Sequence, residues 1–333
     1  MSNQDTSQLL GTRPADDLDG VALERWLRDT VEGFEGPLAY VRFAGGRRNP
    51  TYRLDTPERG YVLRRRPAHP GGEERHPLDR EYRLLQALRP TGYPVPRTLA
   101  LCSDPEVIGS PFYVMELAEG RTLWDETIPG MTAAHRREHF NAWIDALAAL
   151  HAIDPAPLAL DAAGYTECDL DWKVADWIGR HAATVTPTLA RLAAWLPQAL
   201  PEPTPAAIVH GDFRLQNLMF AREGAAVEVV LDWDKAGLGD PRIDLAYVLA
   251  RWVSGTEAHP SLDEIADAEN GIPTSDEVVD RYCRASGREA GTALDWHLAY
   301  TLFRLAVVSH PEDPAHSAAL AENAWQFAER AGA

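Results

Sequence analysis

The chain has 333 residues, 45% of them apolar and 25% charged, so it can bury a sizeable core over two lobes or domains. A formal net charge of −18 argues against wrapping nucleic acid, which needs a basic face. Three widely spaced cysteines, Cys102, Cys168 and Cys283, form no CxxC pair, which disfavours a zinc knuckle or a disulfide framework. The polar N-terminus does not resemble a signal peptide, and no run of about 18 apolar residues occurs, so we expect a cytoplasmic protein without a membrane span.

The first third of the chain predicts a small lobe of strands and one helix. We expect an N-terminal arm and short helix over residues 1–35, followed by an N-lobe over residues 36–118. Within the N-lobe we expect strands on both sides of a turn at residues 56–60, an amphipathic helix at 76–89, and strands at 98–102 and 111–117. This order describes a small α+β lobe.

Helical patterns dominate residues 119–333, which we expect to form a larger C-lobe. The predicted helices cover residues 135–153, 171–196, 240–253, 275–285, 294–308 and 315–330. A short β-rich segment at residues 208–234 interrupts them. It is the segment that carries the chemistry.

Three oxygen-bearing side chains are expected to converge in that segment. Residues 218–220 and 227–231 predict a hairpin closed by a glycine-containing loop. Asn217 comes just before the first strand and Asp232 just after the second, so both should lie at the open end. Asp212, in the run His210-Gly211-Asp212, is one tight loop away.

This combination suits phosphoryl transfer. Mg²⁺ takes oxygen ligands and leaves room for substrate phosphates and water, while a separate carboxylate accepts the proton of the attacking hydroxyl. We therefore predict Asp212 as the catalytic base and Asn217 and Asp232 as metal ligands, and we expect His210 to hold the loop. The spacing H-x-D-x-x-x-x-N is similar to the catalytic loop of protein kinases. An isolated His-Gly-Asp would more often be an ordinary structural turn, so the prediction depends on all three groups.

Further motifs make the resemblance specific. They are His210-Gly211-Asp212 with Asn217, Leu231-Asp232-Trp233-Asp234, Gly239-Asp240 and Asp244-Leu245-Ala246. In this order they resemble the aminoglycoside phosphotransferase and choline kinase superfamily, and most of all the phosphotransferase branch also found fused to acyl-CoA dehydrogenases. The resemblance runs from about Phe43 to Trp252. It implies a protein-kinase-like, two-lobed α+β fold, ATP and Mg²⁺ as cofactors, and a supporting role for Asp244 beneath the catalytic loop.

The resemblance also implies a nucleotide site in the N-lobe. Arg64 stands where protein kinases carry their phosphate-binding lysine, and its guanidinium can grip phosphate in a bidentate manner. Glu81 would be its ion-pair partner, although a surface carboxylate pairing with a neighbouring arginine is the alternative. The remaining nucleotide-side residues are Gly46 in a glycine-containing phosphate loop, Asn49 at the open end of the first hairpin, and Met115, Glu116 and Ala118 at the interlobe hinge.

The acceptor is the part that the sequence leaves open. Tyr165, Trp172 and Trp177 could line the acceptor pocket, although aromatic residues at helical spacing are more often core. The first hypothesis is a kinase that phosphorylates a hydroxyl of a small molecule, and the second is a kinase of the same fold acting on a hydroxyacyl-CoA or related metabolite. A third, of another class, is a catalytically inactive nucleotide-binding module, which the intact Asp212, Asn217 and Asp232 disfavour.

Overall fold

The structure is a computed structural model that describes residues 18–43, 49–67, 78–165, 170–181, 186–255, 260–291 and 293–333. The chain divides into two compact units, which are described separately. Unit 1 consists of Met1–Leu123, Leu158–Gly164 and Leu218–Asp234. Unit 2 consists of Trp124–Pro157, Tyr165–Asn217 and Lys235–Ala333.

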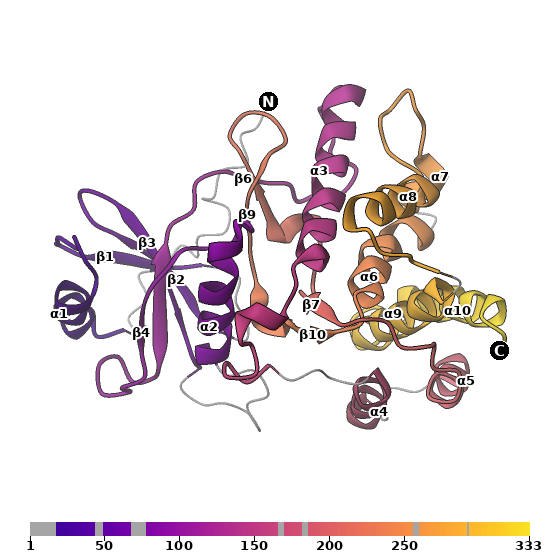
Figure 1. The fold of residues 1–333 in the computed structure, drawn as a ribbon, viewed down its shortest axis with the longest axis horizontal. Helices are drawn as coiled ribbons and strands as arrows, with labels where there is room; N and C mark the ends of the chain where they lie inside the picture. Colours follow the sequence, from indigo (N-terminus) through magenta and orange to yellow (C-terminus); the bar gives the residue numbers. More distant parts are fainter. Residues whose placement is uncertain are drawn as a thin grey trace. The chain divides into compact units, whose positions relative to one another are not determined.

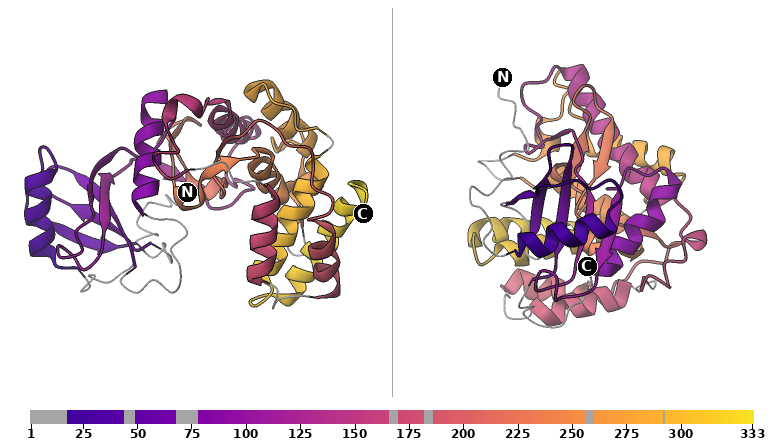
Figure 2. Two further views of the ribbon diagram at one scale, coloured as in Figure 1. Left: turned by 60° about the horizontal axis from the view of Figure 1, so that its bottom comes forward. Right: turned by 90° about the vertical axis from the view of Figure 1, so that its left-hand side faces the viewer.

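Unit 1 is built on a five-stranded antiparallel sheet with one helix on each face (Figures 1 and 2). The strand order is β1 (Ala39–Arg42), β2 (Thr51–Asp55), β3 (Gly60–Arg65), β5 (Phe112–Glu116) and β4 (Thr98–Cys102). The two helices are α1 (Gly20–Thr30) and α2 (Leu78–Leu88). The strands β2 to β5 and the helix α2 lie within a few residues of their sequence predictions, and α1 lies within the segment where a short N-terminal helix is expected.

Side-chain alternation along the strands separates the two faces of this sheet. On the α1 face, Tyr52 and Leu63 are fully buried in an apolar cluster, and Trp26 of α1 packs edge-on against Phe112 with ring centroids 4.7 Å apart. On the α2 face, Arg64 lies opposite Tyr113 in the β3–β5 register. This second face carries the polar groups of the predicted nucleotide site.

Unit 1 also contains a small antiparallel sheet of order β6 (Arg121–Thr122), β8 (Leu218–Phe220) and β9 (Val227–Val230). The β8–β9 pair confirms the predicted hairpin, with Leu218 opposite Val230. β6 was not expected from the sequence. A two-residue strand is too short for alternation to be recognised.

Unit 2 is mainly helical. Its helices are α3 (Ala133–Ala152), α4 (Leu170–His181), α5 (Pro187–Trp195), α6 (Arg242–Val253), α7 (Leu262–Ile265), α8 (Ser275–Ser286), α9 (Leu294–Ser309) and α10 (Pro314–Arg330). The helices α9 and α10 pack side by side, as do α3 and α8 (Figure 1). None of the helices in the described ranges is long and apolar enough to span a membrane.

The prediction of a single helix over residues 171–196 is wrong, because α4 ends at His181 and α5 begins at Pro187. Thr186 caps α5, and its side chain accepts a hydrogen bond from the backbone N–H of Leu189. Proline lacks an N–H and is favoured at the first position of a helix, so Thr186-Pro187 marks a new start. The apolar periodicity continues across the break, which hid it.

Two short strands hold the loop that carries the His-Gly-Asp motif. β7 (Ala207–Val209) pairs antiparallel with β10 (Gly237–Gly239), with Val209 opposite Gly237. The single turns η4 (Leu215–Asn217) and η5 (Trp233–Lys235) lie at the two ends of the β8–β9 hairpin in the chain.

Candidate active site

Asp212 lies in unit 2 on the loop after β7, and only 4% of its surface is exposed. Lys235 Nζ donates to Oδ2 at 2.6 Å, and Tyr247 Oη donates to Oδ1 at 2.7 Å. Arg214 Nε lies 3.5 Å from Oδ1. Burial opposes ionisation of Asp212, but Lys235, Tyr247 and Arg214 outweigh it and lower the pKa of the carboxyl group. The carboxylate is therefore charged at neutral pH and can accept a hydrogen bond.

Gly211 explains why Lys235 reaches this carboxylate. The β7–β10 register, with Val209 opposite Gly237, brings the backbone of Lys235 against Gly211. A Cβ on Gly211 would lie 2.7 Å from the Lys235 carbonyl oxygen, and Gly211 has φ +80°. Only glycine permits both this close approach and this backbone conformation without strain. The glycine of the His-Gly-Asp motif thus lets the two chain segments meet beside Asp212.

Asp244 supports the loop from below. Its carboxylate accepts the backbone N–H of His210 at 2.6 Å and of Gly211 at 2.9 Å, one on each oxygen. His151 Nε2 lies 3.4 Å from Oδ2, and Tyr282 Oη lies 2.8 Å from the other ring nitrogen of His151. Burial opposes ionisation of Asp244, but these partners lower its pKa. The fully buried carboxylate of Asp244 is thus stabilised by hydrogen bonds from the same loop that it supports.

Two side chains of the loop fold back on its own backbone. His210 is fully buried, and its Nδ1 accepts the backbone N–H of Asp212 at 3.2 Å. Asn217 Nδ2 donates to the carbonyl oxygen of Asp212 at 2.8 Å. Because the amide nitrogen of Asn217 is used in this way, its amide oxygen is the atom left for a ligand. It accepts no hydrogen bond from the described residues.

Arg64 is the centre of the polar groups on the α2 face of unit 1. Its Nε lies 3.4 Å from Glu81 Oε2, and its terminal nitrogen donates to Asp232 Oδ1 at 3.0 Å. Tyr113 Oη donates to Glu81 Oε1 at 3.2 Å. Burial disfavours the charge on Arg64, but the nearby carboxylates outweigh it and raise its pKa. Burial raises the pKa of Glu81 to about 7, because the attraction of Arg64 offsets it only in part.

Asp232 follows β9 with its side chain 37% exposed and with φ +64°. This left-handed conformation is uncommon for residues other than glycine and is tolerated best by Asn and Asp. The next residue anchors the turn, since Trp233 Nε1 donates to the Val230 carbonyl at 2.8 Å. Val230 in turn donates its N–H to the Pro94 carbonyl at 2.7 Å. Asp232 is thus fixed beside Arg64 while part of its carboxylate remains open to solvent.

The first hairpin does not bring Asn49 opposite Arg64. Arg64 pairs with Thr51 in the β2–β3 register, and the backbone N–H of Arg65 donates to Pro50. The prediction that Asn49 and Arg64 meet is therefore off by two residues, because the hairpin pairs Asp55 with Gly60 and so places Thr51 opposite Arg64. Gly46 lies outside the described residues.

The hinge residues are partly engaged within unit 1. Met115 is 8% exposed on β5. The backbone N–H of Glu116 donates to the Arg97 carbonyl at 2.9 Å, and its side chain forms an ion pair with Arg97 at 2.6 Å. The backbone N–H of Glu116 is thus already in use, while Ala118 is half-buried, and the adenine contacts of both residues stay a prediction.

The three aromatic residues expected at the acceptor pocket have different environments. Tyr165 is 2% exposed and Trp177 is 8% exposed. Trp177 stacks on His181 with ring centroids 4.2 Å apart and packs edge-on against Phe303. Trp172, at 58% exposed, is the one that a ligand could reach without displacing packed side chains. Their role in acceptor binding stays a prediction.

The sequence reasoning missed the side chains that hold Asp212. Tyr247 follows Asp244 by three residues on α6, so both lie on one side of that helix. The sequence spacing predicts that Asp244 and Tyr247 share one side of the helix, but it does not predict a contact with Asp212. Lys235 is one of only two lysines in the chain, and this rarity is the sequence feature that could have singled it out.

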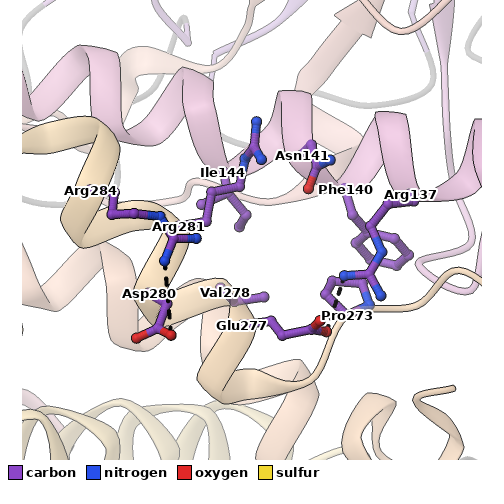
Figure 3. A pocket seen from close by; sticks show the side chains of 10 residues that line it. All are labelled: Arg137, Phe140, Asn141, Ile144, Pro273, Glu277, Val278, Asp280, Arg281 and Arg284. Carbon is purple, nitrogen blue, oxygen red and sulfur yellow. Dashed lines mark hydrogen bonds and ion pairs between the residues drawn. The ribbon is translucent and has the colours of Figure 1, made fainter. Parts of the chain in front are cut away.

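A cavity of about 250 Å³ lies between α3 and α8 (Figure 3). Its wall contains Phe140, Ile144 and Val278, and arginine–carboxylate pairs such as Arg137–Glu277 stand at its rim. None of the predicted site residues lines it.

Curated relatives cover most of this chain but are themselves much longer. Acyl-CoA dehydrogenase family member 10 of Mus musculus is 33% identical over 335 residues, which is 93% of this chain and 31% of that protein. Acyl-CoA dehydrogenase family member 11 of Homo sapiens is 32% identical over 314 residues, 91% of this chain and 40% of that protein. The chain therefore spans well under half the length of either relative.

Solved structures agree on the fold. A protein of Ralstonia eutropha, provisionally described as an aminoglycoside phosphotransferase, is 33% identical with a TM-score of 0.79, over 94% of this chain and 97% of that one. A thermostable variant of an aminoglycoside phosphotransferase, solved with AMP-PNP and hygromycin B, has a TM-score of 0.61 at 15% identity, over 93% and 99%. The predicted kinase-like fold, with a β-rich N-terminal part and a helical C-terminal part, is confirmed. A sequence model of the phosphotransferase enzyme family matches residues 39–296, and the chain belongs to that family.

Proposed function

We propose that this chain transfers the terminal phosphoryl group of ATP to a hydroxyl of a small molecule, with Asp212 as the base. One observation carries the proposal: the Asp212 carboxylate is buried, charged and fixed by donors on both oxygens, in a loop that Asp244 braces. A carboxylate that only ended a turn would not need such a set of partners. Membership of the phosphotransferase family and the AMP-PNP complex of a related fold support the same reaction.

In this reaction the acceptor O–H donates to Asp212. As the acceptor oxygen bonds to phosphorus, the bond from phosphorus to the bridging oxygen of ADP breaks, and the proton passes to the carboxylate. The lowered pKa makes Asp212 a weak base, so the proton moves late, once bonding to phosphorus has made the hydroxyl acidic. The main contribution of Asp212 is then to aim the acceptor oxygen.

Mg²⁺ fits the oxygen donors that we assign to it. Asn217 has its amide oxygen available, and Asp232 presents a partly exposed carboxylate with one oxygen held by Arg64. Among the described residues no group of three His, Cys, Asp or Glu could hold a metal alone, and Mg²⁺ is usually held by one or two side chains plus phosphates and water. When bound, the ion would neutralise charge on the phosphates.

Chain connectivity supports a joint role for these two ligands. Asn217 is bonded to Leu218, the first residue of β8, and Asp232 lies two residues beyond Val230, the partner of Leu218. In this structure Asp232 binds the guanidinium of Arg64. If Asp232 bound the metal instead, Arg64 would stay paired with Glu81 and could bind the nucleotide phosphates.

A hydroxyacyl-CoA or related metabolite is the second candidate acceptor. The observation that favours it is that both named relatives are acyl-CoA dehydrogenase family members in which this chain matches less than half of the length. The structural neighbour solved with hygromycin B favours an aminoglycoside-like acceptor instead. That neighbour is only 15% identical to this chain, so it is the weaker argument.

A screen of ADP release tests the proposal. Aminoglycosides, choline-like amines, sugars and hydroxyacyl-CoAs are compared at equal concentration with Mg-ATP, using wild type and Asp212→Asn in parallel. We expect acceptor-dependent ADP release from the wild type, and the class that gives it identifies the substrate. ATP binding without ADP release for every acceptor would support the inactive nucleotide-binding module instead.

A further inference from the structure

Lysine is rare in this chain, and one of its two lysines lies on the predicted base. Lysine occurs only at positions 173 and 235, while arginine supplies the other basic charges. Lys235 Nζ is 2.6 Å from Asp212 Oδ2, and the lysine side chain is 34% exposed. An arginine here would bring a planar fork, whereas lysine brings a compact charge that can bind a single oxygen.

The partners of Asp212 come from different chain segments and hold both of its oxygens. Lys235 binds Oδ2 from the end of η5, while Tyr247 of α6 donates to Oδ1. Burial and the adjacent Asp212 raise the pKa of Tyr247, so its hydroxyl keeps the proton that it donates. Donors on both oxygens fix the plane of the carboxylate. With Lys235 removed, Oδ2 would have no partner among the described residues, and the group could turn about its Cβ–Cγ bond.

We propose that Lys235 is a positioning residue for phosphoryl transfer, which orients the Asp212 carboxylate toward the acceptor hydroxyl. This inference rests on the proposed function. The reaction forms the bond from acceptor oxygen to phosphorus, breaks the bond to ADP and moves the acceptor proton to Asp212, and Lys235 takes no part in the proton transfer. Lys235 therefore acts through Asp212, and its loss affects turnover rather than nucleotide binding.

The test compares Lys235→Met, Lys235→Gln and Lys235→Arg with wild type, on an acceptor found by the screen. A misaimed reacting group costs about 10²-fold in rate, so Lys235→Met should lower kcat about 100-fold while KM for ATP stays within about threefold. Lys235→Arg keeps the charge and should recover about tenfold of that loss. Arg284→Met is the matched control, since Arg284 is a 72% exposed surface cation on α8 (Figure 3) and should leave kcat unchanged.

A double variant separates positioning from a purely structural role. If Lys235 acts through Asp212, adding Lys235→Met to Asp212→Asn should lower kcat by less than about twofold, because the carboxylate that it orients is already gone. A full additional 100-fold loss would overturn the inference. So would wild-type kcat in Lys235→Met, or a drop that Lys235→Arg does not relieve. If Lys235→Met loses its cooperative thermal transition, the Gln and Arg variants decide by the same criterion.

The outcomes also distinguish this inference from the proposed function. A wild type that releases no ADP with any acceptor overturns both. A wild type that turns over and loses activity in Asp212→Asn, together with a fully active Lys235→Met, overturns only the role of Lys235.

Discussion

Asp244→Asn is the substitution whose cost the structure defines best. Each Asp244 oxygen accepts one backbone N–H, from His210 at 2.6 Å and Gly211 at 2.9 Å, and the side chain is fully buried. Asparagine has one acceptor oxygen, so its NH₂ group must face one of these two N–H groups. The variant loses a charge-assisted hydrogen bond and leaves a buried donor unsatisfied, which together cost about 3–5 kcal/mol.

The assay is urea-induced unfolding monitored by tryptophan fluorescence, and thermal unfolding is a second measure of stability. For a folded unit of this size, about 3–5 kcal/mol corresponds to a decrease in Tm of roughly 10 °C. Asp280→Asn is the control, because that carboxylate on α8 is 72% exposed and lies 3.9 Å from Arg284. It should change the free energy of unfolding by less than about 0.5 kcal/mol.

The stability of wild type relative to Asp244→Asn should also depend on pH, in a direction that the lowered pKa of Asp244 sets. The folded-state pKa of Asp244 is lowered, so its stabilisation is present above the unfolded-state pKa of about 4 and is lost as the pH falls through the folded-state value. The difference in free energy of unfolding between wild type and Asp244→Asn should have its largest value at pH 7 and should decrease only below about pH 4. A gap under about 1 kcal/mol at pH 7, or one that narrows on raising the pH, would refute the reasoning.

Three further substitutions test single elements of the account. Asp232→Asn suits φ +64° and should bind ATP but lose the Mg²⁺-dependent part of its thermal stabilisation; an unchanged thermal shift would remove Asp232 from the metal site. Gly211→Ala should lower the free energy of unfolding by about 2–4 kcal/mol, and more than Gly224→Ala, which has φ +79° but meets no atom within 4 Å; equal losses would contradict the close approach of Lys235. Arg64→Met should weaken ATP binding about tenfold or more in calorimetry while Arg64→Lys weakens it less, and equal affinities would exclude a phosphate contact.

Local patterns were sufficient for most elements of the fold. Strand-like patterns on both sides of a turn located β2 and β3, and apolar periodicity located α6, α8 and α10 within two residues. The break between α4 and α5 was missed although Thr186-Pro187 is a recognisable helix start. The apolar periodicity of the sequence continues through this break, and it outweighs the capping signal in the prediction.

The candidate site was predictable in its residue types but not in its supporting contacts. Asp212 and its neighbours follow one another within a short segment, so their spacing alone suggests metal-assisted phosphoryl transfer. The contacts of Lys235 and Tyr247 with Asp212 depend on the β7–β10 register and on the rotation of α6, which are tertiary features. Asn49 shows the opposite case, since the β2–β3 register places Thr51 and not Asn49 opposite Arg64.

The most direct test of the central claim is the rate of phosphoryl transfer by Asp212→Asn in a single turnover, on the acceptor identified by the screen. We expect a loss of about 10²- to 10⁴-fold in this rate, with ATP affinity and the thermal transition close to wild type. A rate within a few-fold of wild type would contradict the assignment of Asp212 as the base.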